Sequence, residues 1–281
     1  MSPSALPPLG ILAGNLNLPL RVARKLKASG RALAIVGLWG ETAPELEALA
    51  DYFTLLSLGE LASVKAFFKE CGAEELCLAG GISRESVLFN FKPDRDALDL
   101  LATLPSFQTD QLLRAVAAYL EKDGLRLVSA LDIAPEISVR PGLLTPREPG
   151  EELLADLNLA FRVAKELGRL DVGQTAVVSE KITVALEGAD GTDATISRGA
   201  ALSSKPIAVA KVVKPTQDRR FDLPLVGPLT IELLLKVKAG GLILDSGGLI
   251  LLDEEKCVEM AGAGGLVIVA ASQSPYVPAA G

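Results

Sequence analysis

The strongest constraint on the fold is an alternation of apolar runs and amphipathic segments in the first third of the chain. The apolar runs are "LGILAG" (9–14), "ALAIVGL" (32–38), "ELCLAGG" (75–81) and "LRLVSA" (125–130). Between them, residues 18–30, 61–72 and 109–124 show helical spacing of apolar residues and end on glycine. Uniformly apolar strands that alternate with amphipathic helices predict a parallel sheet covered by helices.

The segment "APEISVRPGLLTPREPGEE" (134–152) interrupts this pattern. It is rich in proline and glycine, and proline disfavours helix interiors and central strands. We therefore place a domain boundary here. The expected organisation is an N-terminal domain over residues 1–135 and a C-terminal domain over residues 136–281.

The second domain is predicted to be mixed α/β. Residues 151–168 have a helical apolar face, with glutamates at the start and Gly168 at the end. Strands are expected at 207–213 and 266–270, and two more within 176–188. The run "LILDSGGLILL" (242–252) is interpreted as a hairpin that turns at Ser-Gly-Gly.

Composition excludes several classes of function. The chain of 281 residues has no histidine, so Ser-His-Asp and Cys-His mechanisms and histidine-ligated zinc are ruled out. Its net charge of -7 argues against nucleic-acid binding. The three cysteines form no CxxC pair and indicate structural thiols in a reducing, cytoplasmic setting. No apolar run is long enough for a membrane span, and the first residues do not resemble a signal peptide.

Two strand-to-helix turns in the first domain are candidate ligand sites. Gly14 follows the first apolar run, and Gly80, Gly81 and Ser83 follow the third. Backbone amides at such turns can bind phosphate, and ligands of open α/β sheets lie at the carboxyl ends of the strands. The alternatives are an ordinary turn at Gly14 and a helix-capping serine at Ser83.

Two further candidates lie in the second domain. In "LDVGQTAVV" (170–178), Gln174 lies between a helix and a strand. In "EGADGTDATISR" (187–198), Gly191 and Thr192 could donate hydrogen bonds, and Asp193 could hold a metal or a ribose hydroxyl. The alternatives are turn chemistry at the first motif and a polar loop at the second, with Thr192 or Asp193 as helix N-cap.

The most charged candidate is "KPTQDRRFDLPLVG" (214–227). Lys211 and Lys214 precede or begin it, and an extended backbone would place Arg220 and Asp222 on one side. Cations beside an aspartate suit a phosphate diester or anhydride, because the cations neutralise phosphate and the carboxylate holds a metal or orients water. The alternative is a solvated charged loop.

Three of these motifs together resemble the LpxI-type UDP-2,3-diacylglucosamine pyrophosphatases. The resemblance rests on "AKELGRLDVGQTAVV", "ALEGADGTDATISR" and "KVVKPTQDRRFDLPLVGPLTIE", with "LGILAGNLNLP" similar to the family's opening. It implies a Rossmann-like N-terminal domain, a distinct C-terminal domain, and ligand held between them. It also implies hydrolysis of UDP-2,3-diacylglucosamine to UMP and 2,3-diacylglucosamine 1-phosphate (lipid X) in lipid A biosynthesis.

The resemblance further implies a divalent cation, typically Mg²⁺, and an essential aspartate at Asp222. We expect Asp222 to be a metal ligand that positions water, with Asp193 as the second choice. Lys211, Lys214 and Arg220 would offset the charge of the diphosphate, and Gly14, Gly80, Gly81 and Ser83 would help bind the ligand.

Other readings stay open. Asn15-Leu16-Asn17 stands where the family usually has glycines, and this favours a non-catalytic nucleotide or nucleotide-sugar binding protein as the alternative. A phosphodiesterase with a soluble substrate is a second alternative. The sequence also leaves open a homodimer and a peripheral contact with the inner membrane, where a lipid-linked UDP-sugar would reside.

Overall fold

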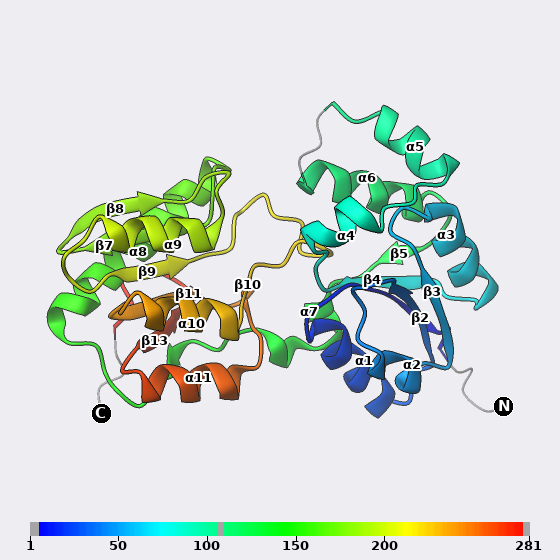
Figure 1. Ribbon diagram of the computed structural model, residues 1–281. Coiled ribbons are helices and arrows are strands. Elements are labelled where there is room, and N and C mark those ends of the chain that lie inside the picture. Colours follow the sequence, from blue (N-terminus) through cyan, green and yellow to red (C-terminus); the bar gives the residue numbers. More distant parts are fainter. Residues whose placement is uncertain (1–5, 106–108, 278–281) are drawn as a thin grey trace. The chain divides into compact units, whose positions relative to one another are not determined.

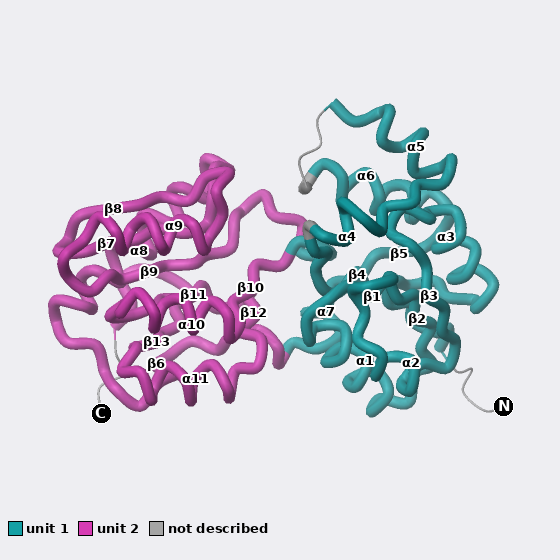
Figure 2. The backbone as a smooth tube through the Cα atoms, viewed as in Figure 1, with its two compact units in different colours: residues 1–135, 219–222 teal, residues 136–218, 223–281 magenta. Residues whose placement is uncertain are grey.

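The chain folds into two compact units. The computed structural model describes residues 6–105 and 109–277. Unit 1 comprises Met1–Pro135 together with Arg219–Asp222, and unit 2 comprises Glu136–Asp218 together with Leu223–Gly281 (Figure 2). Four residues from the second half of the chain thus pack with the first half, which the sequence did not predict.

Unit 1 is built on a parallel sheet with the strand order β3-β2-β1-β4-β5 (Figure 1). This is the order of a doubly wound, Rossmann-like sheet. The strands are added in one direction from β1 to β3 and in the other from β4 to β5, so the strand order reverses between β1 and β4. The strands are β1 (Leu9–Ala13), β2 (Leu33–Leu38), β3 (Tyr52–Leu56), β4 (Glu75–Ala79) and β5 (Arg126–Leu127). The predicted strand at 125–130 is cut short because Ser129 caps the helix that follows.

Helices cover both faces of this sheet, with α1 and α2 on one side and α3 and α6 on the other (Figure 1). They are α1 (Leu18–Ala28), α2 (Glu45–Leu49), α3 (Leu61–Glu70), α4 (Arg84–Phe89), α5 (Arg95–Ala102), α6 (Thr109–Glu121) and α7 (Ala130–Ile133). Helix α1 buries the predicted apolar residues Leu18, Val22 and Leu26, and the chain turns at Gly30 with φ 75°. The predicted parallel sheet between helices is therefore confirmed.

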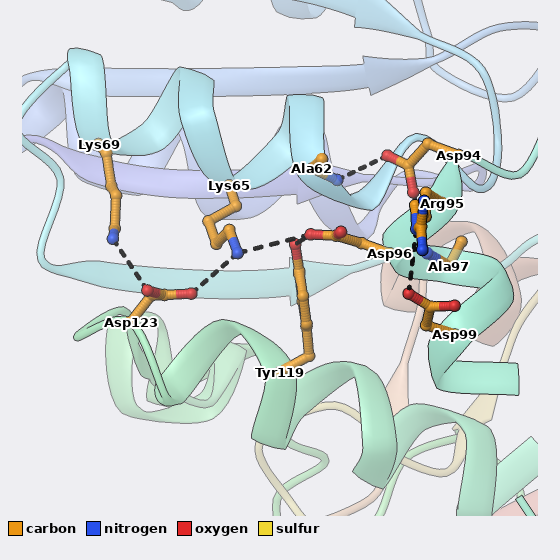
Figure 3. A network of polar contacts seen from close by, with 10 residues as sticks. All are labelled: Ala62, Lys65, Lys69, Asp94, Arg95, Asp96, Ala97, Asp99, Tyr119 and Asp123. Atoms are coloured by element: carbon orange, nitrogen blue, oxygen red, sulfur yellow. Dashed lines mark hydrogen bonds and ion pairs between the residues drawn. The ribbon is translucent and has the colours of Figure 1, made fainter. Parts of the chain in front are cut away.

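A polar network joins α3, α5 and α6 at the surface of unit 1 (Figure 3). Lys65 lies 4.2 Å from the ring centroid of Tyr119 and 2.9 Å from Asp123. Hydrogen bonds that the Lys65 ammonium donates to Tyr119 and Asp123 raise the pKa of Lys65. The Tyr119 hydroxyl donates to Asp96, and Asp94 caps α5 by accepting from the amide of Ala97 at 2.9 Å. Ion pairs and hydrogen bonds between side chains, in addition to apolar packing, thus fix helix α5 to its neighbours.

Unit 2 contains a six-stranded mixed sheet with the order β6-β13-β11-β9-β7-β8. The three strands β13, β11 and β9 are parallel, and the remaining pairs are antiparallel. The strands are β6 (Gly142–Leu143), β7 (Thr175–Ser179), β8 (Ile182–Leu186), β9 (Ala208–Lys211), β11 (Gly241–Asp245) and β13 (Val267–Ala271). The predicted mixed α/β class of the second half is confirmed.

The helices of unit 2 pack on opposite faces of its sheet. Helix α8 (Glu151–Arg169) covers one face, where its Leu157 and Phe161 pack with Ile243 of β11. The other face carries α9 (Thr192–Ala201), α10 (Pro228–Lys236) and α11 (Glu254–Ala263). Leu242 and Leu244 of β11 point to that second face. Both faces of β11 are therefore buried, as expected of a central parallel strand.

The hairpin predicted at 242–252 is wrong. Strand β11 pairs with β9 and β13, whereas β12 (Ile250–Leu251) pairs in parallel with β10 (Leu225–Val226) in a separate two-stranded sheet. The run is apolar at nearly every position instead of alternating, and this pattern fits strands buried on both faces better than a half-exposed hairpin.

The two strands predicted within 176–188 form the antiparallel pair β7 and β8. Glu180 and Lys181 make the turn, both with positive φ. Their amides donate to the Asp156 carboxylate on α8 at 2.9 and 2.7 Å. Asp156 therefore ties the turn to the helix, since a buried carboxylate needs such donors.

The three cysteines differ in how deeply they are buried. All three are free thiols, and Cys77 and Cys257 are buried. Burial raises the pKa of Cys77 to about 12 and that of Cys257 to about 11, so both stay protonated at neutral pH. In the described part of the chain, no helix is both long and apolar enough to cross a membrane.

Candidate functional sites

The carboxyl edge of the unit 1 sheet brings two predicted glycine turns together. The Gly14 amide donates to the carbonyl of Ala79 at 2.8 Å, and the Asn15 amide donates to the carbonyl of Gly81 at 2.9 Å. A Cβ at Gly14 would lie 2.1 Å from the Gly81 oxygen, and one at Gly80 would lie 2.3 Å from the Asn15 oxygen. Only glycine allows this backbone contact, which lies at the switch point where doubly wound sheets bind ligands.

A carboxylate that sequence reasoning missed organises this edge. Glu41 accepts hydrogen bonds from the Ser83 amide at 3.0 Å, from the Ser83 hydroxyl, and from the Asn15 side chain. Burial alone would raise the pKa of Glu41, but the hydrogen bonds from Ser83, Ser86 and Asn15 outweigh it and hold the pKa below its ordinary value. Glu41 follows strand β2 closely, as Gly14 and Gly80 follow β1 and β4.

Ser83 serves as a helix cap. Its hydroxyl accepts from the Ser86 amide at 3.1 Å while donating to Glu41. The alternative interpretation of a capping serine is therefore confirmed. Because its single hydroxyl proton is already used, Ser83 has only a lone pair left for a ligand.

The segment Arg219–Asp222 packs within unit 1. Phe221 lies against the apolar cluster of Val64, Phe68 and Leu120, with the Arg220 guanidinium 5.6 Å from its ring. Arg220 Nη1 also pairs with Glu121 Oε1, at the end of α6, at 2.6 Å. Asp222, partly buried, ends this segment. The candidate catalytic aspartate is thus positioned by a buried aromatic side chain and an ion pair.

The extended backbone predicted here is wrong. Turns occur at Pro215–Thr216 and at Arg219–Phe221, so the alternation that placed Arg220 and Asp222 on one side does not apply. The turn brings the Phe221 ring against the apolar core of unit 1, and this packing stabilises the turn relative to an extended strand. The proline signals identified an irregular segment but could not give its path.

In unit 2, one edge of the six-stranded sheet is formed by the start of β7 and the ends of β8, β9 and β11. Glu187, which follows β8, is buried. Its carboxylate accepts hydrogen bonds from the backbone amide of Gln174 and from the Thr192 hydroxyl, both at 2.9 Å. A Cβ at Gly173 would lie 2.3 Å from the Glu187 carbonyl oxygen. Glu187, which the sequence analysis missed, therefore joins the two motifs that were predicted separately.

Gln174 has a buried acceptor to offer a ligand. Its backbone oxygen accepts from the Val212 amide at 2.9 Å. Its side-chain Oε1 is buried and has no hydrogen-bond partner within the described residues. Because an unpaired buried acceptor costs about 1–3 kcal/mol, such a group indicates a missing donor.

Helix α9 begins inside the predicted motif, with Gly191 as its N-cap at φ 80°. The N-cap is thus Gly191, neither Thr192 nor Asp193. Asp193 is exposed in the first turn. Neighbouring Asp190 accepts from Arg198 at 2.8 Å, and this contact contributes most to lowering its pKa.

The lysines of the charged stretch have acceptors close by. Lys211 is nearly buried and donates to the Leu225 carbonyl at 3.0 Å. Lys214 pairs with Asp171 at 2.8 Å. The buried Asp245, at the end of β11, accepts from the Val213 amide at 2.9 Å and pairs with Lys165. The stretch is therefore a set of balanced charges instead of a bare cationic cluster.

The carboxylates present suit a metal ion that is held mainly by the phosphates of a bound molecule. The described residues contain no group of three or more His, Cys, Asp or Glu placed to hold a cation. Asp222 belongs to unit 1 and Asp193 to unit 2. Mg²⁺ accepts one or two carboxylates with waters and phosphates, so a single carboxylate is compatible with it.

A cavity of about 470 Å³ lies elsewhere in unit 2, lined by Leu143, Glu148, Pro149, Tyr276 and neighbouring backbone. It contains none of the predicted site residues. Burial raises the pKa of Tyr276, and Glu148 adds to the shift. We assign this cavity no part in the chemistry.

The fold and these edges define a two-unit α/β protein, with a Rossmann-like sheet, whose candidate ligand groups gather where strands end. Residues 8–137 match the model of the LpxI N-terminal domain, and residues 140–269 match that of the LpxI C-terminal domain. The chain is 33% identical over 274 residues to the UDP-2,3-diacylglucosamine pyrophosphatase LpxI of Caulobacter vibrioides, covering 93% of this chain and 96% of the relative. The chain belongs to the LpxI family.

Likeness to solved structures is remote. The biotin carboxylase domain of 2-oxoglutarate carboxylase from Hydrogenobacter thermophilus aligns with 62% of this chain and 35% of that chain, at 16% identity and a TM-score of 0.25. The biotin carboxylase subunit of pyruvate carboxylase aligns with 66% of this chain and 36% of that chain, at 15% identity and a TM-score of 0.23. Neither bears on the function.

Proposed function

We propose that this protein hydrolyses the pyrophosphate bond of UDP-2,3-diacylglucosamine, releasing UMP and 2,3-diacylglucosamine 1-phosphate (lipid X) in lipid A biosynthesis. The observation that carries the proposal is a sequence identity of 33%, over nearly the full length of both chains, to a relative whose name states this activity. The charged stretch that carries Asp222 adds to it, because it supplies both the carboxylate and the cationic side chains that anhydride hydrolysis uses.

In this reaction, a water oxygen forms a bond to one phosphorus of the anhydride, and the bridging oxygen leaves with the other phosphate. We assign Asp222 the role of orienting that water. A carboxylate group accepts hydrogen bonds from water and is a weak base, so it suits orienting the water more than deprotonating it. Its anchoring through Phe221 and Arg220 would hold the carboxylate in position.

The remaining assignments follow from chemistry. Lys211 and Lys214 would offset phosphate charge, and Lys214 would exchange Asp171 for the ligand. The Thr192 amide at the start of α9 suits a phosphate oxygen, and the Gly191 amide, which donates to the Gly188 carbonyl at 3.3 Å, would have to exchange that partner. The unpaired Gln174 Oε1 would accept from a ligand N–H or hydroxyl. Gly14, Gly80 and Gly81 would shape the edge of the sheet where the ligand binds, because the two turns pack against each other there.

We also propose that Mg²⁺ assists, held by Asp222 and by substrate phosphates, with Asp193 as the second candidate. The cation would supply charge neutralisation. The substrate is a lipid, so we place the protein at the cytoplasmic face of the inner membrane.

The test is UMP release from UDP-2,3-diacylglucosamine, with magnesium or with EDTA, and with UDP-N-acetylglucosamine as an acyl-free comparison. We expect one UMP per lipid X, with magnesium and the acyl chains required. Turnover of the acyl-free substrate would favour the soluble phosphodiesterase. Binding of UDP-2,3-diacylglucosamine without turnover would favour the non-catalytic binding protein and overturn the assignment.

A further inference from the structure

Helix α4 is amphipathic in the inverted sense. Its inward side is polar: Ser86 is 2% exposed, and the Asn90 side chain donates to the Ser86 hydroxyl at 3.2 Å. Its outward side is apolar, with Leu88 74% and Phe89 75% exposed. A helix at the surface of a protein in water normally shows the opposite arrangement.

The exposed apolar surface extends beyond the helix. Trp39 is 56% exposed, and its carbonyl accepts from the Asn90 side chain at 3.5 Å, which places it beside the end of α4. Val87 and Phe91 are 53% and 41% exposed. We call Trp39, Val87, Leu88, Phe89 and Phe91 the α4 patch. Contiguous exposed apolar surface of this kind marks an interaction site.

The α4 patch is held rigidly. Ser83 and Ser86 both hydrogen-bond to Glu41. After the helix, the Lys92 amide donates to the Leu58 carbonyl at 2.7 Å. The apolar side chains are therefore presented outward by polar anchors on their inner side, so exposure is built into the fold.

We propose that the α4 patch docks the protein on the surface of a phospholipid bilayer. Tryptophan and phenylalanine favour the membrane interface, and the exposed cations Lys92 and Arg95 follow the helix and suit anionic headgroups. Arg95, whose side chain is 91% exposed, pairs with the exposed Asp99 at 3.7 Å, and such a pair is weak enough to yield to lipid phosphate.

The choice of a bilayer as the occupant rests on the proposed function. The patch continues directly from Gly80, Gly81 and Ser83, which the sequence predicts to bind the ligand. An enzyme that takes a diacylated substrate must meet the membrane next to its binding residues. An interfacial helix does this without a membrane-spanning segment.

The test uses the full chain and vesicles of phosphatidylethanolamine and phosphatidylglycerol, without substrate. Trp39 is the single tryptophan of the chain, so its emission reports on the patch itself. We expect co-sedimentation with the vesicles, a blue shift of Trp39 emission, and quenching by brominated lipid. Leu88→Ser/Phe89→Ser should lower vesicle partitioning by about ten- to a hundredfold, because two large apolar side chains are lost.

The matched control is Leu202→Ser/Leu229→Ser, at positions 67% and 73% exposed in unit 2. It should bind vesicles like the wild type, and both double variants should keep the wild-type melting temperature. Absence of vesicle binding by the wild type, or an equal loss in both double variants, would overturn the proposal. A concentration-dependent dimer that Leu88→Ser/Phe89→Ser abolishes would assign the patch to a second copy of the chain.

Activity separates the remaining possibility. With substrate dispersed in detergent, Leu88→Ser/Phe89→Ser should keep the wild-type kcat/KM, whereas with substrate in vesicles its kcat/KM should fall. An equal fall in detergent would mean that the patch receives the acyl chains and would contradict docking. Failure of UMP release with intact vesicle binding would sink the proposed reaction and leave the docking surface standing.

Discussion

The edges of the two sheets are assembled in different ways. In unit 1, turns at Gly14 and Gly80 meet backbone to backbone, and one partly buried carboxylate, Glu41, joins the neighbouring side chains. In unit 2, the buried carboxylates Glu187 and Asp245 hold the motifs through backbone amides, a hydroxyl and a lysine. The first edge depends on the absence of side chains, and the second on buried carboxylates whose oxygens accept hydrogen bonds.

The largest expected effect is at Gly14. Gly14→Ala would place a methyl group 2.1 Å from a backbone oxygen that cannot move without disturbing β4, so unit 1 should lose about 3 kcal/mol of stability. Urea unfolding followed by Trp39 fluorescence measures this. Gly262→Ala, followed by far-UV circular dichroism in urea, is the control, because its methyl group would meet Pro146 at 3.5 Å at an exposed position of α11. A loss at Gly14 no larger than at Gly262 would break the contrast.

Glu187 should show the next largest effect. Glu187→Ala leaves the Gln174 amide and the Thr192 hydroxyl without their acceptor, at a cost of about 2–3 kcal/mol. Glu187→Gln keeps a carbonyl oxygen for one of them and should recover about half. Far-UV circular dichroism in urea gives the stability of each variant. Equal losses in the two variants would show that the charge, and not the acceptor geometry, matters.

Phe221 tests whether the Asp222 segment belongs to unit 1. Phe221→Ala removes a partly buried ring from the core of that unit, so we expect a loss of about 1–2 kcal/mol, read by Trp39 fluorescence in urea. UMP release should fall through kcat, because Asp222 loses its anchor. Unchanged stability of unit 1 would contradict the assignment of this segment.

The smallest effect concerns acid stability. The pKa of Glu41 is lowered in the folded protein, so its contribution is present above its ordinary pKa and is lost as the pH falls through the lowered value. The melting temperature of Glu41→Gln should therefore depend less on pH below about pH 4.5 than that of the wild type. If the melting temperatures of the two proteins changed with pH in the same way, Glu41 would not contribute to the stability of this edge of the sheet.

The sequence predicted those features that depend on local chemistry. Apolar runs ending at Gly14 and Gly81 located β1 and β4, and the apolar face through Leu157 and Phe161 located α8. Glycine turns after buried strands identified the edge of unit 1. These predictions succeed because strand burial, helix amphipathicity and turn conformation are each set by neighbouring residues.

Features that depend on distant pairing were missed. Glu187 directly follows β8 and Asp245 ends β11, but their partners come from other segments, so sequence order alone did not reveal them. The docking of Phe221 on unit 1 is likewise a tertiary event. The hairpin at 242–252 failed because strands buried on both faces and hairpins share apolar residues and glycine. An acidic residue at the end of a strand, or directly after it, is the signal that could have identified both carboxylates.

The most direct test of the central claim compares kcat for UMP release from UDP-2,3-diacylglucosamine in Asp222→Asn and Asp193→Asn. Both substitutions preserve shape and remove one charge. We predict a fall of about 10²–10⁴-fold in Asp222→Asn, with the melting temperature unchanged, and a smaller fall in Asp193→Asn. Wild-type turnover in Asp222→Asn, together with loss of turnover in Asp193→Asn, would contradict the account and move the chemistry to α9.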